Sequence, residues 1–219
     1  EPAAGYLSHP GYAALPKAPY RYQEMLGVIW RENPSCYLQD GEQAVLMAAL
    51  METDNQGRPL IDAWIKRSGL TADAWLEKLF EATVIPFYHL LCRYGVALIA
   101  HGQNVTLVMK DYVPQRILLK DFQGDMRLVD EDFPQAESLP KEVKAVTARL
   151  SADYIIHDLQ TGNFVTVLRF ISRLTLQSGV SETRFYQILA GVLHRYMAAH
   201  PELAERFTKS TTSRRFVVA

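Results

Sequence analysis

The sequence predicts an α+β fold that is mainly helical, with a helix bundle around a small antiparallel β-hairpin sheet. Two observations support this class. Apolar residues recur at spacings of three and four over much of the chain, which indicates amphipathic helices. Around residues 105–119 the spacing changes to two, which indicates a pair of strands. A chain of 219 residues with 48% hydrophobic residues is long and apolar enough for one sizeable domain or two small ones.

Helices are expected both before and after this pair of strands. Thr71 is a predicted N-cap, because its hydroxyl can accept a hydrogen bond from a free backbone N–H in the first turn. Pro86 is expected to kink or break the helix that follows, because proline has no N–H to donate. Besides the segment after Thr71, the expected helices span residues 20–30, 42–51, 60–67, 87–100, 164–176 and 181–200.

The hairpin follows the most apolar of these segments. Residues 87–100 are almost wholly apolar, and a helix that is apolar on all sides is buried. We therefore expect this helix to deliver His101 from the core. Residues 105–110 and 116–119 then form the two strands, and residues 126–129 are a candidate third strand.

The two ends of the chain are not expected to belong to the folded domain. Four prolines prevent a long helix in residues 1–19, which are expected to be an extended connector. The folded domain is expected over residues 20–207, with an acidic solvated loop at 130–141. Residues 208–219 form a polar tail without periodicity. Because the sequence starts at Glu1 rather than at Met, we expect it to be part of a longer polypeptide.

Composition argues against several classes of protein. A net charge of −1 gives no basic footprint for nucleic acid. The sequence has no apolar run long enough for a membrane span. Its two cysteines, Cys36 and Cys92, form no CxxC motif, which argues against a thiolate metal site and fits a reducing, cytoplasmic location.

The candidate catalytic and ligand-binding residues lie on the two sides of the hairpin. The run His101-Gly102-Gln103-Asn104 precedes it, and Lys120-Asp121 follows it. Phosphates bind Lys, Arg and backbone N–H groups, whereas Mg²⁺ binds carboxylate and amide oxygens. A side-chain oxygen from Asn104 and one from Asp121 could reach a single Mg²⁺. Lys120 and Asp121 point to opposite faces if the strand continues, so either the chain bends there or Lys120 has a different partner.

Two further readings of these residues stay open. His101 is either a hydrogen-bond donor to substrate or a general acid or base. The order Asn, strands, Asp also resembles the arrangement in protein kinases, so a kinase-like phosphotransferase lobe is an alternative function.

Other polar and aromatic residues are expected to have structural roles. Arg31 and Glu32 are interpreted as an ion pair at a helix end. Trp30, Trp64 and Trp75 fit core or subunit contacts, which is compatible with a homo-oligomer.

Two motifs carry a family resemblance. YGVALIAHGQN at residues 94–104 and RILLKDFQGDMRL at residues 116–128 closely resemble the carboxy-terminal region of siderophore synthetases that work without a peptide-synthetase template. This is the IucA/IucC-like family, which includes the aerobactin synthases. LGVIWREN at residues 26–33 is also similar to its members. The resemblance covers residues 20–207.

The resemblance implies a fold, an activity and a ligand set. Family members adenylate a citrate-type carboxylate with ATP, and an amine or hydroxylamine then displaces AMP to give the amide of a hydroxamate siderophore. This chain would be most of the palm of a hand-like synthetase. His101 would contact the acid and the phosphate, Gln103 and Asn104 would face nucleotide and metal, and Asp121 would bind Mg²⁺. Further nucleotide- or substrate-binding candidates are Lys120, Arg127 and Lys209.

Half of the expected site has no counterpart in the sequence. The family's Ser/Thr/Arg cluster for the nucleotide lies upstream in longer chains, and nothing in residues 1–34 resembles it. The missing amino-terminal part of the enzyme is therefore an expected partner, and the chain alone is expected to be inactive. A non-catalytic oligomerisation or scaffold fragment is the third candidate function.

Overall fold

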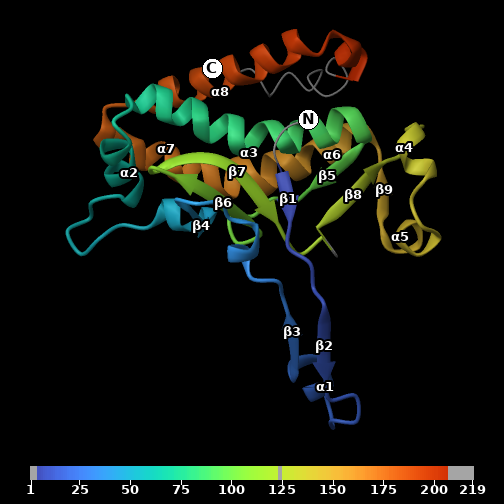
Figure 1. Ribbon diagram of the computed structural model, residues 1–219. Helices are drawn as coiled ribbons and strands as arrows, with labels where there is room; N and C mark the ends of the chain where they lie inside the picture. The colour runs from blue at the N-terminus through green and yellow to red at the C-terminus, as the bar shows by residue number, and fades with distance from the viewer. Residues whose placement is uncertain (1–3, 123–124, 207–219) are drawn as a thin grey trace.

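A four-stranded sheet lies at the centre of the computed structural model, which describes residues 4–122 and 125–206 (Figure 1). Its strand order is β1-β7-β6-β4, with β1 parallel to β7 and the other neighbours antiparallel. The hairpin predicted from the period-two pattern is confirmed as β6 and β7. The bounds are β1 Ala4–Tyr6, β4 Glu42–Leu46, β6 Val105–Lys110 and β7 Val113–Leu119.

The fold has two smaller sheets. One pairs β2 (Gly11–Ala14) with β3 (Gly27–Trp30), and the short helix α1 (Tyr22–Met25) lies between these strands in the chain. The other has the order β5-β8-β9. The candidate strand at residues 126–129 is confirmed as β8, but it pairs with β5 rather than with the hairpin. The bounds are β5 Val96–Leu98, β8 Met126–Val129 and β9 Ala148–Leu150.

Helices cover the sheets. The long helix α3 lies across the four-stranded sheet against β7, and α8 packs on the outer side of α3 (Figure 1). The α-helices are α2 Leu60–Ser68, α3 Ala72–Tyr94, α4 Pro134–Glu137, α5 Lys141–Val146, α6 Ala152–Leu159, α7 Arg169–Leu174 and α8 Glu182–Ala199. The 3₁₀ helices are η1 Pro34–Tyr37, η2 Met47–Met51, η4 Thr175–Ser178 and η5 Pro201–Leu203, and η3 Gln160–Leu168 is a π-helix.

Helix α3 begins as predicted but ends early. The Thr71 hydroxyl accepts a hydrogen bond from the Ala74 N–H at 3.2 Å, as expected for an N-cap. Of the two outcomes expected at Pro86, a kink or a break, the break does not occur, because the helix runs through this buried residue and its packing outweighs one lost hydrogen bond. The helix ends at Tyr94, because Gly95 takes the left-handed conformation with φ +65°. Residues 87–100 are therefore not one helix, and β5 delivers His101.

Two other expected helices are also wrong. Residues 20–30 form a single helical turn and then β3, because Val28, Ile29 and Trp30 are β-branched or aromatic and pair with β2. Residues 42–51 form β4, which pairs with β6, followed by the 3₁₀ helix η2. In the second segment, pairing with a strand about 60 residues away in the sequence overrides local helix propensity.

The carboxy-terminal half follows the sequence more closely. Ser181 caps α8 by accepting from the Arg184 N–H at 3.2 Å, and the helix ends near His200 as predicted. The helix expected at residues 164–176 begins inside the π-helix η3. The loop expected at residues 130–141 contains the one-turn helix α4. The tail 208–219 lies outside the described residues.

The core lies between α3, α8 and the sheet. Trp75, Phe80 and Phe185 are fully buried, and the rings of Phe80 and Phe185 meet edge to face at 5.0 Å. Of the helices within residues 4–122 and 125–206, none is long and apolar enough to cross a lipid bilayer.

Candidate functional site

The run His101-Gly102-Gln103-Asn104 forms a tight turn between β5 and β6. The Asn104 N–H donates to the His101 carbonyl at 2.9 Å, which closes the turn. Gly102 lies against η2, where its carbonyl accepts from the Ala48 N–H at 3.0 Å. A Cβ at Gly102 would lie 3.2 Å from the backbone of Ala48. The glycine is therefore explained by close backbone approach, which fixes one side of the turn.

The π-helix η3 holds the other side of this turn. Asn163 is fully buried, and its amide donates to the Ala100 carbonyl at 3.2 Å, directly before His101. A Cβ at Gly162 would meet Ile99 Cγ2 at 2.9 Å and the Ala100 nitrogen at 3.0 Å. A π-helix has a wide turn and is common at functional sites. Here it packs against the backbone that leads into His101.

The chain bends between Lys120 and Asp121. Strand β7 ends at Leu119, and Asp121 has the left-handed φ of +59°. The Lys120 N–H donates to the Asn104 carbonyl at 3.2 Å, which ties the two sides of the hairpin together. Of the two alternatives for Lys120 and Asp121, the bend is the one observed. Both residues line the same cavity.

This cavity brings together three of the predicted site residues. It has a volume of about 10 Å³, so it holds about one water, and a nucleotide would have to lie beside it. The Asn104 amide donates to an Asp125 carboxylate oxygen at 2.6 Å. The polar lining residues are Asn104, Lys120, Asp121 and Asp125. Amide and carboxylate oxygens are the donors that Mg²⁺ prefers, so this donor set fits the implied metal.

Asp121 is also held by residues from far away in the chain. Arg31 donates to its carboxylate at 2.6 Å, and His9 Nε2 lies 3.2 Å from the same oxygen. The interpretation of Arg31 and Glu32 as a helix-end ion pair is wrong, because Glu32 instead accepts from the Ser8 N–H at 3.0 Å. The Arg31 Nε also donates to His9 Nε2 at 2.8 Å, so Arg31 is the cation of this group and His9 Nε2 is an acceptor.

Burial and a neighbouring positive charge change the pKa of Lys120. Its side chain is only 10% exposed, and its Nζ lies 4.0 Å from an Asp121 oxygen. Burial, together with the positive charge of Arg31, lowers the pKa of Lys120, and Asp121 opposes the shift. A buried ammonium with a depressed pKa gains from a nearby anion, as a phosphate would provide.

The remaining predicted residues lie away from this lining. His101 is half-buried and Gln103 is exposed, and neither lines the cavity. Arg127 lies on β8, and its guanidinium donates to the Met126 carbonyl at 3.0 Å. Burial raises the pKa of Asp158, and the charge of Arg127 works against that shift. Lys209 lies outside the described residues.

Three residues near the site were not predicted from the sequence to belong to it. Asp125 had a signal, because it follows Asp121 closely in the same polar segment. Arg31 lies in the LGVIWREN motif, but nothing in the sequence placed it or His9 beside Asp121, because 90 residues separate Arg31 from Asp121. Within the described ranges, His, Cys, Asp and Glu do not gather in groups of three or more that could hold a metal. A metal here would therefore need the Asn104 amide, and ligands from outside the described residues, in addition to the carboxylates of Asp121 and Asp125.

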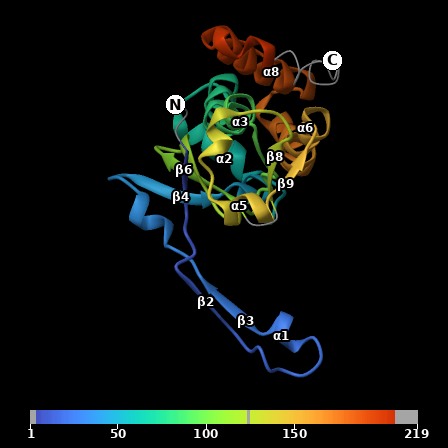
Figure 2. The same cartoon turned by 90° about the vertical axis from the view of Figure 1, so that its right-hand side faces the viewer.

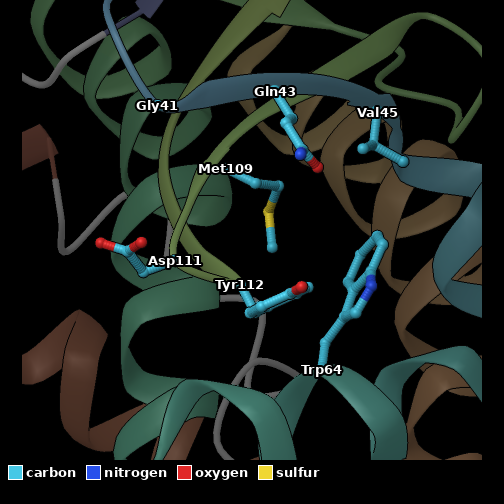
Figure 3. Close-up of a pocket in the computed structure, with 7 residues that line it drawn as sticks. All are labelled: Gly41, Gln43, Val45, Trp64, Met109, Asp111 and Tyr112. Carbon is cyan, nitrogen blue, oxygen red and sulfur yellow. The ribbon is translucent and has the colours of Figure 1, made fainter.

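A second, larger cavity lies at the opposite end of the hairpin. It measures about 140 Å³ and lies beside the turn at Asp111 and Tyr112. In Figure 3, Met109, Tyr112 and Trp64 point into a shared space, whereas the Asp111 carboxylate points away from it. None of the site residues predicted from the sequence lines this cavity, so it is separate from the candidate site.

Comparison with known families identifies the class of protein. Residues 73–217 match the family described as ferric iron reductase FhuF-like transporter, and residues 1–52 match the IucA / IucC family. The chain is 69% identical to aerobactin synthase of Escherichia coli over 207 residues, which are 94% of this chain and 36% of that protein. It is 39% identical to the rhizobactin siderophore biosynthesis protein RhbF of Rhizobium meliloti, covering 94% of this chain and 35% of that protein.

Solved structures of siderophore biosynthesis proteins also match this chain. Aerobactin synthetase IucC of Klebsiella pneumoniae matches 95% of this chain with a TM-score of 0.88 and 62% identity. Petrobactin biosynthesis protein AsbB of Bacillus anthracis matches 95% with a TM-score of 0.84 and 25% identity. Residues 73–217, most of the chain, therefore belong to the FhuF-like family. The resemblance to the IucA / IucC family is confirmed by the match of residues 1–52 and by the identity to aerobactin synthase. The chain spans about a third of the length of the curated relatives described above.

Proposed function

We propose that this chain supplies one wall of the nucleotide and metal site of an ATP-dependent siderophore synthetase. The observation that carries the proposal is the convergence of Asn104, Lys120, Asp121 and Asp125 on one cavity at the end of the hairpin. Two loops that are adjacent only through the hairpin thus present oxygen donors and a buried cation together. Family membership supplies the reaction class.

The proposed reaction has two steps. A carboxylate oxygen of a citrate-type acid attacks the α-phosphorus of ATP, and pyrophosphate leaves. An amine or hydroxylamine then attacks the acyl carbon, AMP leaves, and the nitrogen loses a proton. Aerobactin synthases are the relatives that point to a hydroxamate siderophore as the product.

Each residue has a role in this proposal. Asn104, Asp121 and Asp125 would hold Mg²⁺, which when bound neutralises phosphate charge. Lys120 would attract the phosphates by its charge. His101, clamped by η2 and η3, would donate a hydrogen bond to the acid or the phosphate, and Gln103 would contact the nucleotide from the exposed rim.

The name of the FhuF-like family points to a different chemistry, iron reduction. An iron–sulfur cluster is typically held by four cysteine thiolates. This chain has two cysteines, of which Cys36 is exposed and Cys92 is buried. The residues of this chain therefore favour the ligase over an iron–sulfur reductase.

A matched pair of substitutions tests the proposal. Asp111 and Asp121 both have left-handed φ angles and lie at opposite ends of β7, and asparagine tolerates that conformation. The test protein is the E. coli aerobactin synthase in which this chain replaces the region it matches. We expect Asp121→Asn to lower citrate-dependent ATP–pyrophosphate exchange by roughly 10- to 100-fold, a loss of the size seen for substitutions around metal sites, and Asp111→Asn to leave it unchanged.

Product analysis separates the alternatives. The ligase releases AMP and pyrophosphate, whereas a kinase-like lobe would release ADP. The 219-residue chain alone is expected to show no exchange, because it spans only 36% of the E. coli synthase. Exchange by the isolated chain, or equal activity of the two Asp→Asn variants, would contradict the proposal. A replaced enzyme that binds no ATP–Mg²⁺ would favour the scaffold function.

A further inference from the structure

Residues 11–30 form an arm that extends away from the rest of the molecule. It consists of β2, α1 and β3, and two views a quarter-turn apart show it reaching out from the helices and sheets (Figures 1 and 2). Nine of its large apolar side chains are exposed to solvent. They are Tyr12, Leu15, Tyr20, Tyr22, Met25, Leu26, Val28, Ile29 and Trp30. A patch of this kind marks an interaction surface.

The strands of the arm are apolar on both faces. Tyr12 pairs with Ile29 on one face, and Ala13 pairs with Val28 on the other. A strand with one face in water alternates apolar and polar residues, whereas a continuous apolar run is typical of a strand covered on both faces. A two-stranded hairpin standing alone is also only marginally stable in water. The arm therefore has the pattern of an element that is enclosed, not one that lies on a surface.

The family boundaries indicate what encloses it. The arm falls wholly within residues 1–52, which match the IucA / IucC family, whereas most of the domain that carries the arm matches a different family from residue 73 onwards. Related synthetases are about three times as long as this chain, which covers 36% of the E. coli protein. In the Klebsiella synthetase, a polypeptide of which this chain matches 38%, the same fold holds over 95% of the chain.

We propose that the arm is the surface by which this chain docks on the remaining part of the same synthetase, the part that the chain does not span. The base of the arm supports this choice. His9 and Arg31 lie just outside β2 and β3, and both contact Asp121 in the candidate site. Docking of the arm thus brings the remaining part of the enzyme next to Asp121, where the second wall of the nucleotide site is needed.

Cysteine labelling tests the docking. Ile29→Cys is compared with Leu176→Cys, both in a Cys36→Ser background, because the two native side chains are 63% and 56% exposed. Each variant is made in the 219-residue chain and in the E. coli synthase that carries this chain in place of its matching region. We expect maleimide to label Ile29→Cys about tenfold more slowly in the long polypeptide, because the arm must first undock. Leu176→Cys should react at the same rate in both.

Two results would overturn the proposal. One is an equal labelling rate for Ile29→Cys in the two polypeptides. The other is protection in the isolated chain that grows with its concentration, which would make a second copy the partner. A thermal-unfolding measurement checks the result independently of labelling. Val28→Ser should leave the Tm of the isolated chain unchanged and lower that of the long polypeptide, and no change in either would also count against docking.

Discussion

Replacing Asn163 by alanine should destabilise the protein by loosening the backbone that leads into His101. Asn163 is fully buried, and its amide donates to the carbonyl of Ala100, which is itself buried. Losing that hydrogen bond costs about 1 kcal/mol of unfolding free energy. The cavity left by the shortened side chain costs about 1 kcal/mol more. We therefore expect Asn163→Ala to lower the free energy of unfolding by about 2 kcal/mol.

Two comparison variants isolate the cause. Gln177→Ala also removes a side-chain amide that donates to a carbonyl, that of Gly57 at 3.2 Å, but this bond is exposed. Its cost should stay below about 0.5 kcal/mol. Asn163→Leu should cost less than Asn163→Ala, because leucine refills the space and removes an amide oxygen that has no hydrogen-bond partner in the described chain.

Urea denaturation followed by circular dichroism measures these differences, and hydrogen exchange locates them. Amides of residues 101–104 should exchange faster in Asn163→Ala than in the unsubstituted chain, because their anchor is gone. Equal unfolding free energies for Asn163→Ala and Gln177→Ala would refute the reasoning. So would unchanged exchange of residues 101–104, because the π-helix would then not position the turn.

Two further predictions concern stability. Hydrogen bonding to the Arg116 guanidinium lowers the pKa of Glu42 from 4.5 to about 2, so this contribution is present above pH 4.5 and is lost as the pH falls toward 2. The difference in unfolding free energy between the parent chain and Arg116→Met should therefore be constant near neutral pH and shrink below pH 4.5; a difference independent of pH would contradict it. Gly95→Ala should lower the Tm more than Gly69→Ala, because both glycines have left-handed φ but only a Cβ at Gly95 would meet a ring, that of Phe133 at 2.5 Å. Equal losses in thermal denaturation would show that backbone strain alone decides.

Local signals in the sequence predicted the elements that depend on local contacts. Thr71 caps its helix as expected, and the helix expected from residue 181 begins with Ser181 as its cap, because an N-cap bond joins residues three positions apart. The hairpin was equally predictable, since its two strands are neighbours in the chain. The comparisons confirmed the family resemblance, which was based mainly on HGQN and KDF on opposite sides of that hairpin.

Long-range pairing was not predictable in this way. Residues 42–46 form a strand because β6 pairs with them, and β1 joins the sheet beside β7 more than a hundred residues later in the chain. The contact of Arg31 with Asp121 likewise depends on how the arm leaves the body of the domain. The left-handed conformation of Asp121 was also not predictable, because the residue at this position is not a glycine.

The pair of Arg31 with Asp121 makes two equilibria depend on each other. An ion that binds the Asp121 carboxylate competes with the guanidinium at 2.6 Å, and Arg31 lies at the base of the arm. If enclosure of the arm changes the affinity of Asp121 for Mg²⁺ by some factor, then Mg²⁺ changes the affinity of the arm for its enclosure by the same factor. Metal loading and assembly of the two parts of the synthetase would then be measurable through each other.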